Sequence, residues 1–171
     1  MIQTEKKTLM TSYKVFKVVD SVEKYLGIIH EDGVTLTLTF EDKEIRNGHT
    51  KSILDKYKFL ISAGVEFKIN QFDIDTLVTS IPGVEVSGTG ADSVLTVKGK
   101  AISLRGAASE FVLRPYGNED DESQKIVIHC AANDVDFSLT FKVDEETSIP
   151  FRLLGMPDDQ DRIITIGGFT V

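Results

Sequence analysis

The side chains most suited to chemistry are three histidines and one cysteine. His30, His49 and His129 lack metal-ligand spacing such as H-x-x-x-H, and no C-x-x-C pair accompanies them. His129 and Cys130 are neighbours in an expected strand, so their side chains point to opposite faces and cannot form a nucleophile and its base. We therefore expect Cys130 to pack as a small core residue and His129 to lie at a surface or an interface.

Carboxylates gather in two clusters, Glu119–Glu122 and Asp158–Asp161. The second reads D-D-x-D, and calcium prefers dense oxygen ligands, but neither cluster has the spacing of an EF-hand. Acidic hairpin tips are usually solvated, which is what we expect for both. A pair of glycosidase carboxylates, which meets in space and not in sequence, stays open.

No local motif indicates an enzyme. There is no G-x-S-x-G elbow, and Gly88-Thr89-Gly90 lacks the G-K-[ST] ending of a phosphate-binding loop, so a glycine turn is expected there. The sequence contains no tryptophan, which counts against an aromatic groove for sugars. We therefore expect no catalytic activity, no metal and no cofactor.

Length and charge limit the classes of protein that fit. The chain has 171 residues, with 27 acidic and 19 basic side chains and a formal net charge of -8. This length predicts a single domain spanning residues 1–171. An acidic chain is unsuited to coating DNA or binding an anionic membrane, because both tasks need Lys and Arg. One cysteine allows no intramolecular disulfide, and no apolar run is long enough to cross a bilayer.

The elements that must position these residues are mostly strands. From Val34 to Phe40, apolar residues alternate with threonines, which predicts a strand with one buried and one wet face. Residues 135–143 alternate in the same way and are expected to form a hairpin with 125–131. The other expected strands are 13–19, 25–30, 57–61 and 65–69 (joined by a turn at 62–64), 84–87, 94–98, 110–116, and a last pair, 149–154 with 162–166.

One helix is expected, over about 71–80. An apolar stripe and an N-cap at Asn70 predict it; the stripe consists of Ile74, Leu77, Val78 and Ile81. Many short strands and one helix predict a mostly β fold, an antiparallel sandwich or barrel-like structure with a flanking helix.

Three segments are expected to be irregular. Residues 41–56 are polar with both signs of charge, and they predict a long loop between strands. Residues 1–12 predict a flexible N-terminal arm, and residues 167–171 form a C-terminal tail.

Four segments near the C-terminus carry a family likeness: KIVIHCA (125–131), DFSLTFK (136–142), IPFRLLGM (149–156) and RIITIGG (162–168). In this succession the chain resembles the major tail tube proteins of long-tailed, non-contractile (siphophage-type) bacteriophages. Those proteins tend to end with strand pairs, an I-P-F/L-x-F/L strand, an acidic loop and a terminal I/L-x-x-I-G. The order of the elements upstream is also similar.

The resemblance implies a structural, self-assembling virion protein. Tail tube subunits are β-sandwiches with a flanking helix, and six of them join into a ring by extending their inner sheets edge to edge. Closure pairs the inner edge strands, and rings stack into a hollow tube for the genome. The implied partners are copies of this chain, the tape measure protein, the tail tip (distal tail) and tail terminator proteins, and DNA in transient passage. The implied location is the phage tail, with assembly in the host cytoplasm.

Two sets of residues follow from this resemblance. Family members use the long loop, with the terminal arms, to grip the next ring. That role is carried over to Lys43, Glu44, Arg46, Asn47, His49 and Lys51. An acidic channel wall repels phosphate and lets DNA slide. The candidates to face that channel, from the polar sides of the two alternating strands, are Thr35, Thr37, Thr39, Asp136, Ser138 and Thr140.

Two other functions stay open beside this one. The inner tube protein of a contractile tail or of a type VI-like secretion system shares the fold. A β-sandwich module that binds carbohydrate or protein belongs to a different class, and it predicts a monomer with a ligand groove. A β-fold hydrolase has no motif in its favour.

Overall fold

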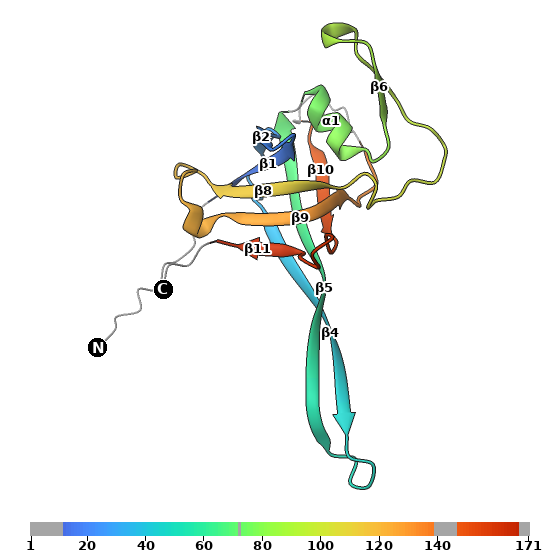
Figure 1. Cartoon of the computed structure of the whole chain (residues 1–171). Helices are drawn as coiled ribbons and strands as arrows, with labels where there is room; N and C mark the ends of the chain where they lie inside the picture. Colours follow the sequence, from blue (N-terminus) through green and yellow to red (C-terminus); the bar gives the residue numbers. More distant parts are fainter. Residues whose placement is uncertain (1–11, 72, 139–146, 168–171) are drawn as a thin grey trace, which may run out of the picture.

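The computed structural model describes residues 12–71, 73–138 and 147–167 (Figure 1). These residues are mostly in antiparallel strands, with one α-helix, as the sequence predicts. The expectations for residues 1–11, for residues 168–171 and for Thr140 lie outside the described residues. Within them, no helix is both long and apolar enough to cross a membrane.

Nine strands of the described part form one antiparallel sheet. They are β1 (Tyr13–Val19), β2 (Val22–Tyr25), β3 (Ile28–Ile29), β4 (Thr35–Arg46), β5 (Ile53–Gln71), β8 (Ser109–Pro115), β9 (Ile126–Asn133), β10 (Ile149–Gly155) and β11 (Ile164–Ile166). The main path runs β2-β1-β8-β9-β10-β5-β3, with β4 alongside β5 and β11 alongside β9. A separate hairpin pairs β6 (Glu85–Ser87) with β7 (Val94–Thr96).

The sheet turns a corner between β9 and β10. These strands share a short register, from Leu153↔Asn133 to Gly155↔Ala131, while the start of β9 pairs with β11 instead. In Figure 1, β8, β9 and β11 run roughly horizontally, whereas β5 and β10 run roughly vertically. The two parts therefore face each other as crossed layers around one core.

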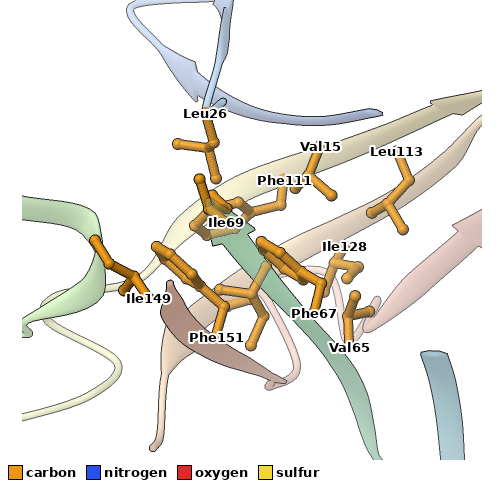
Figure 2. Close-up of a cluster of buried hydrophobic side chains, with 12 residues drawn as sticks. Val15, Leu26, Val65, Phe67, Ile69, Phe111, Leu113, Ile128, Ile149 and Phe151 are labelled. Carbon is orange, nitrogen blue, oxygen red and sulfur yellow. The ribbon is translucent and has the colours of Figure 1, made fainter. Parts of the chain in front are cut away.

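Alternate residues of the two layers fill this core. Because successive side chains of a strand point to opposite faces, every second residue is buried. Figure 2 shows the buried cluster between the layers. It includes Val15, Leu26, Val65, Phe67, Ile69, Phe111, Leu113, Ile128, Ala131, Ile149, Phe151 and Leu153. At its centre Phe67 and Phe151 stack with ring centroids 5.0 Å apart.

The prediction of a long loop at 41–56 is wrong. Strands β4 and β5 continue through it as one hairpin, and their register runs from Thr35↔Glu66 to Arg46↔Ile53. Only residues 47–52 turn the chain.

The predicted turn at 62–64 is also wrong, because β5 runs straight through it. Ala63 and Gly64 are paired on both sides, with β4 and with β10. The two strands expected at 57–61 and 65–69 are therefore one strand of 19 residues.

The helix, α1 (Ile74–Ser80), starts later than expected. Its N-cap is Asp73, whose carboxylate accepts a hydrogen bond from the backbone N–H of Thr76 at 2.9 Å; Asn70 lies in β5. The predicted apolar stripe is only half-buried, and the most buried residues are Thr76, Thr79 and Ser80. Each of these hydroxyls lies within hydrogen-bond distance of a backbone carbonyl, so their burial leaves no polar group unsatisfied.

Two further strand predictions do not hold. Residues 134–138, expected to start a strand at 135, form none; Asp136 and Ser138 are exposed there, and Phe137 packs against the core. The last pair is wrong as well, since β10 pairs with β5 and β9, and β11 pairs with β9.

Candidate functional site

The most unusual feature of the molecule is the outer half of the β4–β5 hairpin, which projects from the body in Figure 1. We call residues 40–61 the arm. Core packing ends where Leu38 faces Ala63, which is fully buried, and every residue of β4 beyond Leu38 is exposed. A two-stranded ribbon away from the core leaves both of its faces to solvent.

One face of the arm carries ion pairs. Residues opposite each other in an antiparallel pair share a face, which places Asp42 with Lys58 and Glu44 with Lys56. The ammonium of Lys56 lies 2.8 Å from a carboxylate oxygen of Asp42. This contact lowers the pKa of the Asp42 carboxyl and raises the pKa of Lys56. Further along, Arg46 is bound to Glu44 at 2.6 Å.

The other face of the arm is aromatic. Tyr57 and Phe59 are two residues apart, so they share a face, and their rings stack with centroids 6.5 Å apart. Lys43 and Glu41 lie opposite them on β4. Neither ring packs against the body, and each is about half exposed.

Apolar exposure extends over the whole arm. Seven large side chains are between 45% and 63% exposed: Phe40, Ile45, Ile53, Leu54, Tyr57, Phe59 and Ile61. Single exposed apolar residues are normal, but a gathering of this size on one ribbon marks an interaction surface.

Asn47 organises the tip of the arm. Its side-chain oxygen accepts hydrogen bonds from the backbone N–H groups of His49 (2.8 Å) and Thr50 (3.1 Å). The backbone N–H of Asn47 donates to the carbonyl of Ser52 at 2.9 Å, which closes the turn. His49 and Lys51 are exposed on this turn, with Lys51 at a positive φ of 59°.

The six residues predicted to grip a neighbouring ring therefore all lie on the arm, but on different surfaces. Lys43 is on the aromatic face, Glu44 and Arg46 are on the ion-paired face, and Asn47, His49 and Lys51 form the tip.

The predicted wet face is found at Thr35, Thr37 and Thr39. All three are exposed, while Leu36 and Leu38 between them are half-buried, which confirms the alternation. Opposite the threonines lie the outer residues of β5: Ser62, Gly64 and Glu66. Glu66 is bound to Arg152 at 3.5 Å, and Lys68 to Asp32 at 2.9 Å, so this outer surface is polar with balanced charge.

The sheet has open edges at β4 and at β2. In the described part of the chain, β4 is hydrogen-bonded only to β5, and β2 only to β1. The outer edges of these two strands leave backbone N–H and C=O groups free to pair with another strand.

The clusters that could have done chemistry are engaged in structural contacts. Glu119 is paired with Lys14, and Glu122 with Arg114. Asp158 binds Arg162 through two hydrogen bonds of 2.9 and 2.7 Å. Among the residues that the structure describes, no three His, Cys, Asp or Glu side chains are grouped to hold a metal ion.

His129 and Cys130 occupy different sites. His129 lies in β9, and its ring nitrogen Nε2 is 2.7 Å from the hydroxyl of Thr165. Its other nitrogen is 3.4 Å from a carboxylate oxygen of Glu110. Cys130 is a free thiol and is only partly buried, less than its expected core position implies.

No family model matches the chain, and no curated protein matches it.

Sequence reasoning missed the apolar content of the arm. Residues 57–61 are expected to form a strand separate from the polar segment 41–56, and the sequence carries no signal that the two segments pair. The register of β4 with β5 shows that pairing.

Proposed function

We propose that this chain is a structural subunit that assembles with copies of itself into stacked rings, forming the hollow tail tube of a phage through which DNA passes. The observation that carries the proposal is the arm, which holds seven large apolar side chains in water. Covering such side chains is favourable by roughly 25 cal/mol per Å² of apolar surface. A neighbouring subunit that receives the arm supplies that cover.

The open sheet edges support a second copy as the occupant. In the described part of the chain, β4 lies at one edge of the sheet beside β5, and β2 lies at another edge beside β1. Pairing β4 of one copy with β2 of the next would repeat head to tail, and a heterologous contact of this kind closes into a ring when the rotation permits.

The arm then reaches beyond the ring. In this proposal its aromatic face, with Lys43 beside Tyr57, and its tip, with Asn47, His49 and Lys51, contact the next ring. Glu44 and Arg46 lie on the opposite, ion-paired face, where they keep one side of the ribbon soluble.

The polar outer surface supports a role as channel wall. We assign this role to Thr35, Thr37 and Thr39 and, after β9, to the exposed Asp136 and Ser138. Together with the net charge of -8, a hydroxyl-rich wall offers phosphate no strong binding site. The proposed partners are the tape measure, tail tip and tail terminator proteins, in the virion and in the host cytoplasm during assembly.

The test is assembly itself, followed by size-exclusion chromatography and negative-stain electron microscopy over a range of concentrations, with and without a nucleating tail tip. The wild type is expected to form rings or tubes. Tyr57→Ser with Phe59→Ser is expected to abolish them while the circular dichroism spectrum is unchanged. The control is Val86→Ser with Val94→Ser, which removes similarly exposed apolar side chains from the β6–β7 hairpin and leaves assembly intact.

Two results would overturn the proposal. One is wild-type protein that stays monomeric under every condition; if it then binds a glycan or a peptide, a monomeric binding module takes its place. The other is undiminished tube formation by the arm variant.

A further inference from the structure

A cleft of about 390 Å³ lies where α1, the end of β1, the adjoining ends of β8 and β9, and the loop 100–107 meet. Its wall is apolar at Ile102 and Phe111 and polar at Lys17, Thr79 and Ser109. We call it the Lys17 cleft, because Lys17 is the charged residue in its lining.

The strand register explains why a lysine points inward here. Lys17 is directly opposite Phe111 in the β1–β8 pair, and opposite residues share a face. Phe111 is only 2% exposed, so Lys17 is on the core side, at the end of the sheet where the core opens under α1.

Among the residues that the structure describes, the ammonium of Lys17 has no carboxylate partner. It donates a hydrogen bond to the hydroxyl of Thr79 at 3.2 Å, and no described Asp or Glu forms an ion pair with it. Burial lowers the pKa of Lys17; Asp75 opposes this effect from a distance and Lys24 adds to it. A cation partly removed from water without an anion is costly, so an anion that entered the cleft would be favoured.

A serine hydroxyl in the lining can also donate. The Ser103 hydroxyl already accepts a hydrogen bond from Gly106 at 3.2 Å, which leaves its own hydrogen to donate. Both ends of the Asn133 amide are engaged, since it donates to the carbonyl of Ser80 and accepts from the N–H of Arg152. The cleft therefore favours an acceptor with negative charge, such as a carboxylate.

A carboxylate of this kind is displayed at the opposite end of the same hairpin. Residues 116–125 join β8 to β9, and Figure 1 shows this turn at one end of the two strands and α1 near the other. In that turn Glu119 and Glu122 are bound to Lys14 and Arg114, and Asp121 caps the following turn by accepting from Ser123. Asp120 is exposed, and none of the described cations forms an ion pair with it.

We propose that Asp120 of one copy enters the Lys17 cleft of the next copy, joining β8–β9 hairpins head to tail. This inference rests on the proposed self-assembly and names one of its contacts. Because the donor and the receiving cleft lie at opposite ends of one element, the contact is heterologous and repeats in one direction. The contact also makes the assembly polar, because a cleft can bind a tip but cannot bind another cleft, and two tips cannot bind each other.

Charge reversal tests this contact. Lys17→Glu and Asp120→Lys are each expected to raise the critical concentration for assembly about tenfold or more, as loss of a desolvated charge pair does. The double variant is expected to return to near the wild-type value. An equal mixture of the two single variants is expected to assemble too, because each supplies the charge that the other needs. Asp161→Lys, at the exposed tip before β11, and Lys98→Glu, after β7, are matched controls without effect.

Several outcomes would overturn the contact. If the single variants assemble like the wild type, the contact between Asp120 and Lys17 is ruled out, but the proposed function is not, since tubes still form. If the single variants are impaired and neither the double variant nor the mixture restores assembly, Lys17 and Asp120 are needed for folding and not for this contact. Wild-type protein that never assembles would remove the contact together with the proposed function. Asp120 is exposed, so Asp120→Lys keeps the test valid if Lys17→Glu unfolds.

Discussion

Arg114 and Glu23 are joined by two hydrogen bonds of 2.8 Å, from Nε and Nη2 of the guanidinium to the two carboxylate oxygens. Through its remaining nitrogen, Arg114 donates to the carbonyl of Glu119 and to the carboxylate of Glu122, each at 2.8 Å. The Arg114 hydrogen bonds hold the pKa of Glu23 below its ordinary value. Arg114 thus binds β8 to β2 and fixes the turn that carries Asp120.

Arg114→Met is expected to lower the free energy of unfolding by about 1–3 kcal/mol, because it leaves the partly buried Glu23 without its bidentate partner. Urea denaturation followed by circular dichroism measures the change. The matched control is Arg105→Met, whose ion-pair partner Asp159 is fully exposed; about 0.5 kcal/mol or less is expected there. Equal losses for the two variants would contradict the structural role of Arg114.

Gly155→Ala tests the corner of the sheet. A Cβ at Gly155 would lie 2.9 Å from Cγ2 of Ile128 and 3.0 Å from the carbonyl oxygen of Ala63, closer than real Cβ atoms pack. Overpacking of this kind costs about 1–3 kcal/mol, so the melting temperature should fall. Gly48→Ala is the control, because nothing lies within 4 Å of the added methyl and melting should hardly change.

Asp73→Ala tests the start of α1. The substitution removes the side-chain acceptor for the backbone N–H of Thr76, and the loss of such a cap costs about 1 kcal/mol. Asp75→Ala removes a carboxylate from the same turn without removing a cap, so a smaller loss of stability is expected in thermal denaturation. A larger effect at Asp75 would place the N-cap elsewhere.

Asp158 should make part of the stability acid-sensitive. Hydrogen bonds from Arg162 lower the pKa of the Asp158 carboxyl from 3.8 to about 2. The ionised form is favoured in the folded state, so this contribution is complete above pH ~4 and is lost as the pH falls towards 2. In urea titrations between these pH values, Asp158→Asn should be less pH-dependent than the wild type. Asp159→Asn, a fully exposed neighbour, should keep the wild-type slope.

Sequence periodicity predicted the elements that have one buried face. The bounds of β1 match the expected 13–19, and the Thr-Leu alternation of β4 is as predicted. The arm escaped prediction because a ribbon without a buried face carries no hydropathy period on β4, where Glu41 to Glu44 are all charged. The Ser62-Ala63-Gly64 turn failed for a different reason: pairing with two strands distant in sequence overrides the local turn preference.

The candidate sites depended even more on non-local register. The sequence places six polar residues in one segment. Strand formation puts Lys43 and Glu44 on opposite faces, and the pairing of β4 with β5 places Tyr57 and Phe59 on the face of Lys43. Lys17 stands in a segment with apolar residues on both faces, so its inward face cannot be assigned until its partner Phe111 is known.

The unbroken course of β5 has a mechanical consequence. Val65, Phe67 and Ile69 are fixed in the core, and the same strand continues from Ala63 into the arm, past a register shift opposite Thr39 and Phe40. It runs on the order of 30 Å to Ile53 at 3.3 Å per residue. Because β5 is continuous from the arm into the core, a force applied to the tip of the arm is transmitted along the backbone to Phe67, which stacks on Phe151. Pulling on the arm therefore strains the core of the same subunit.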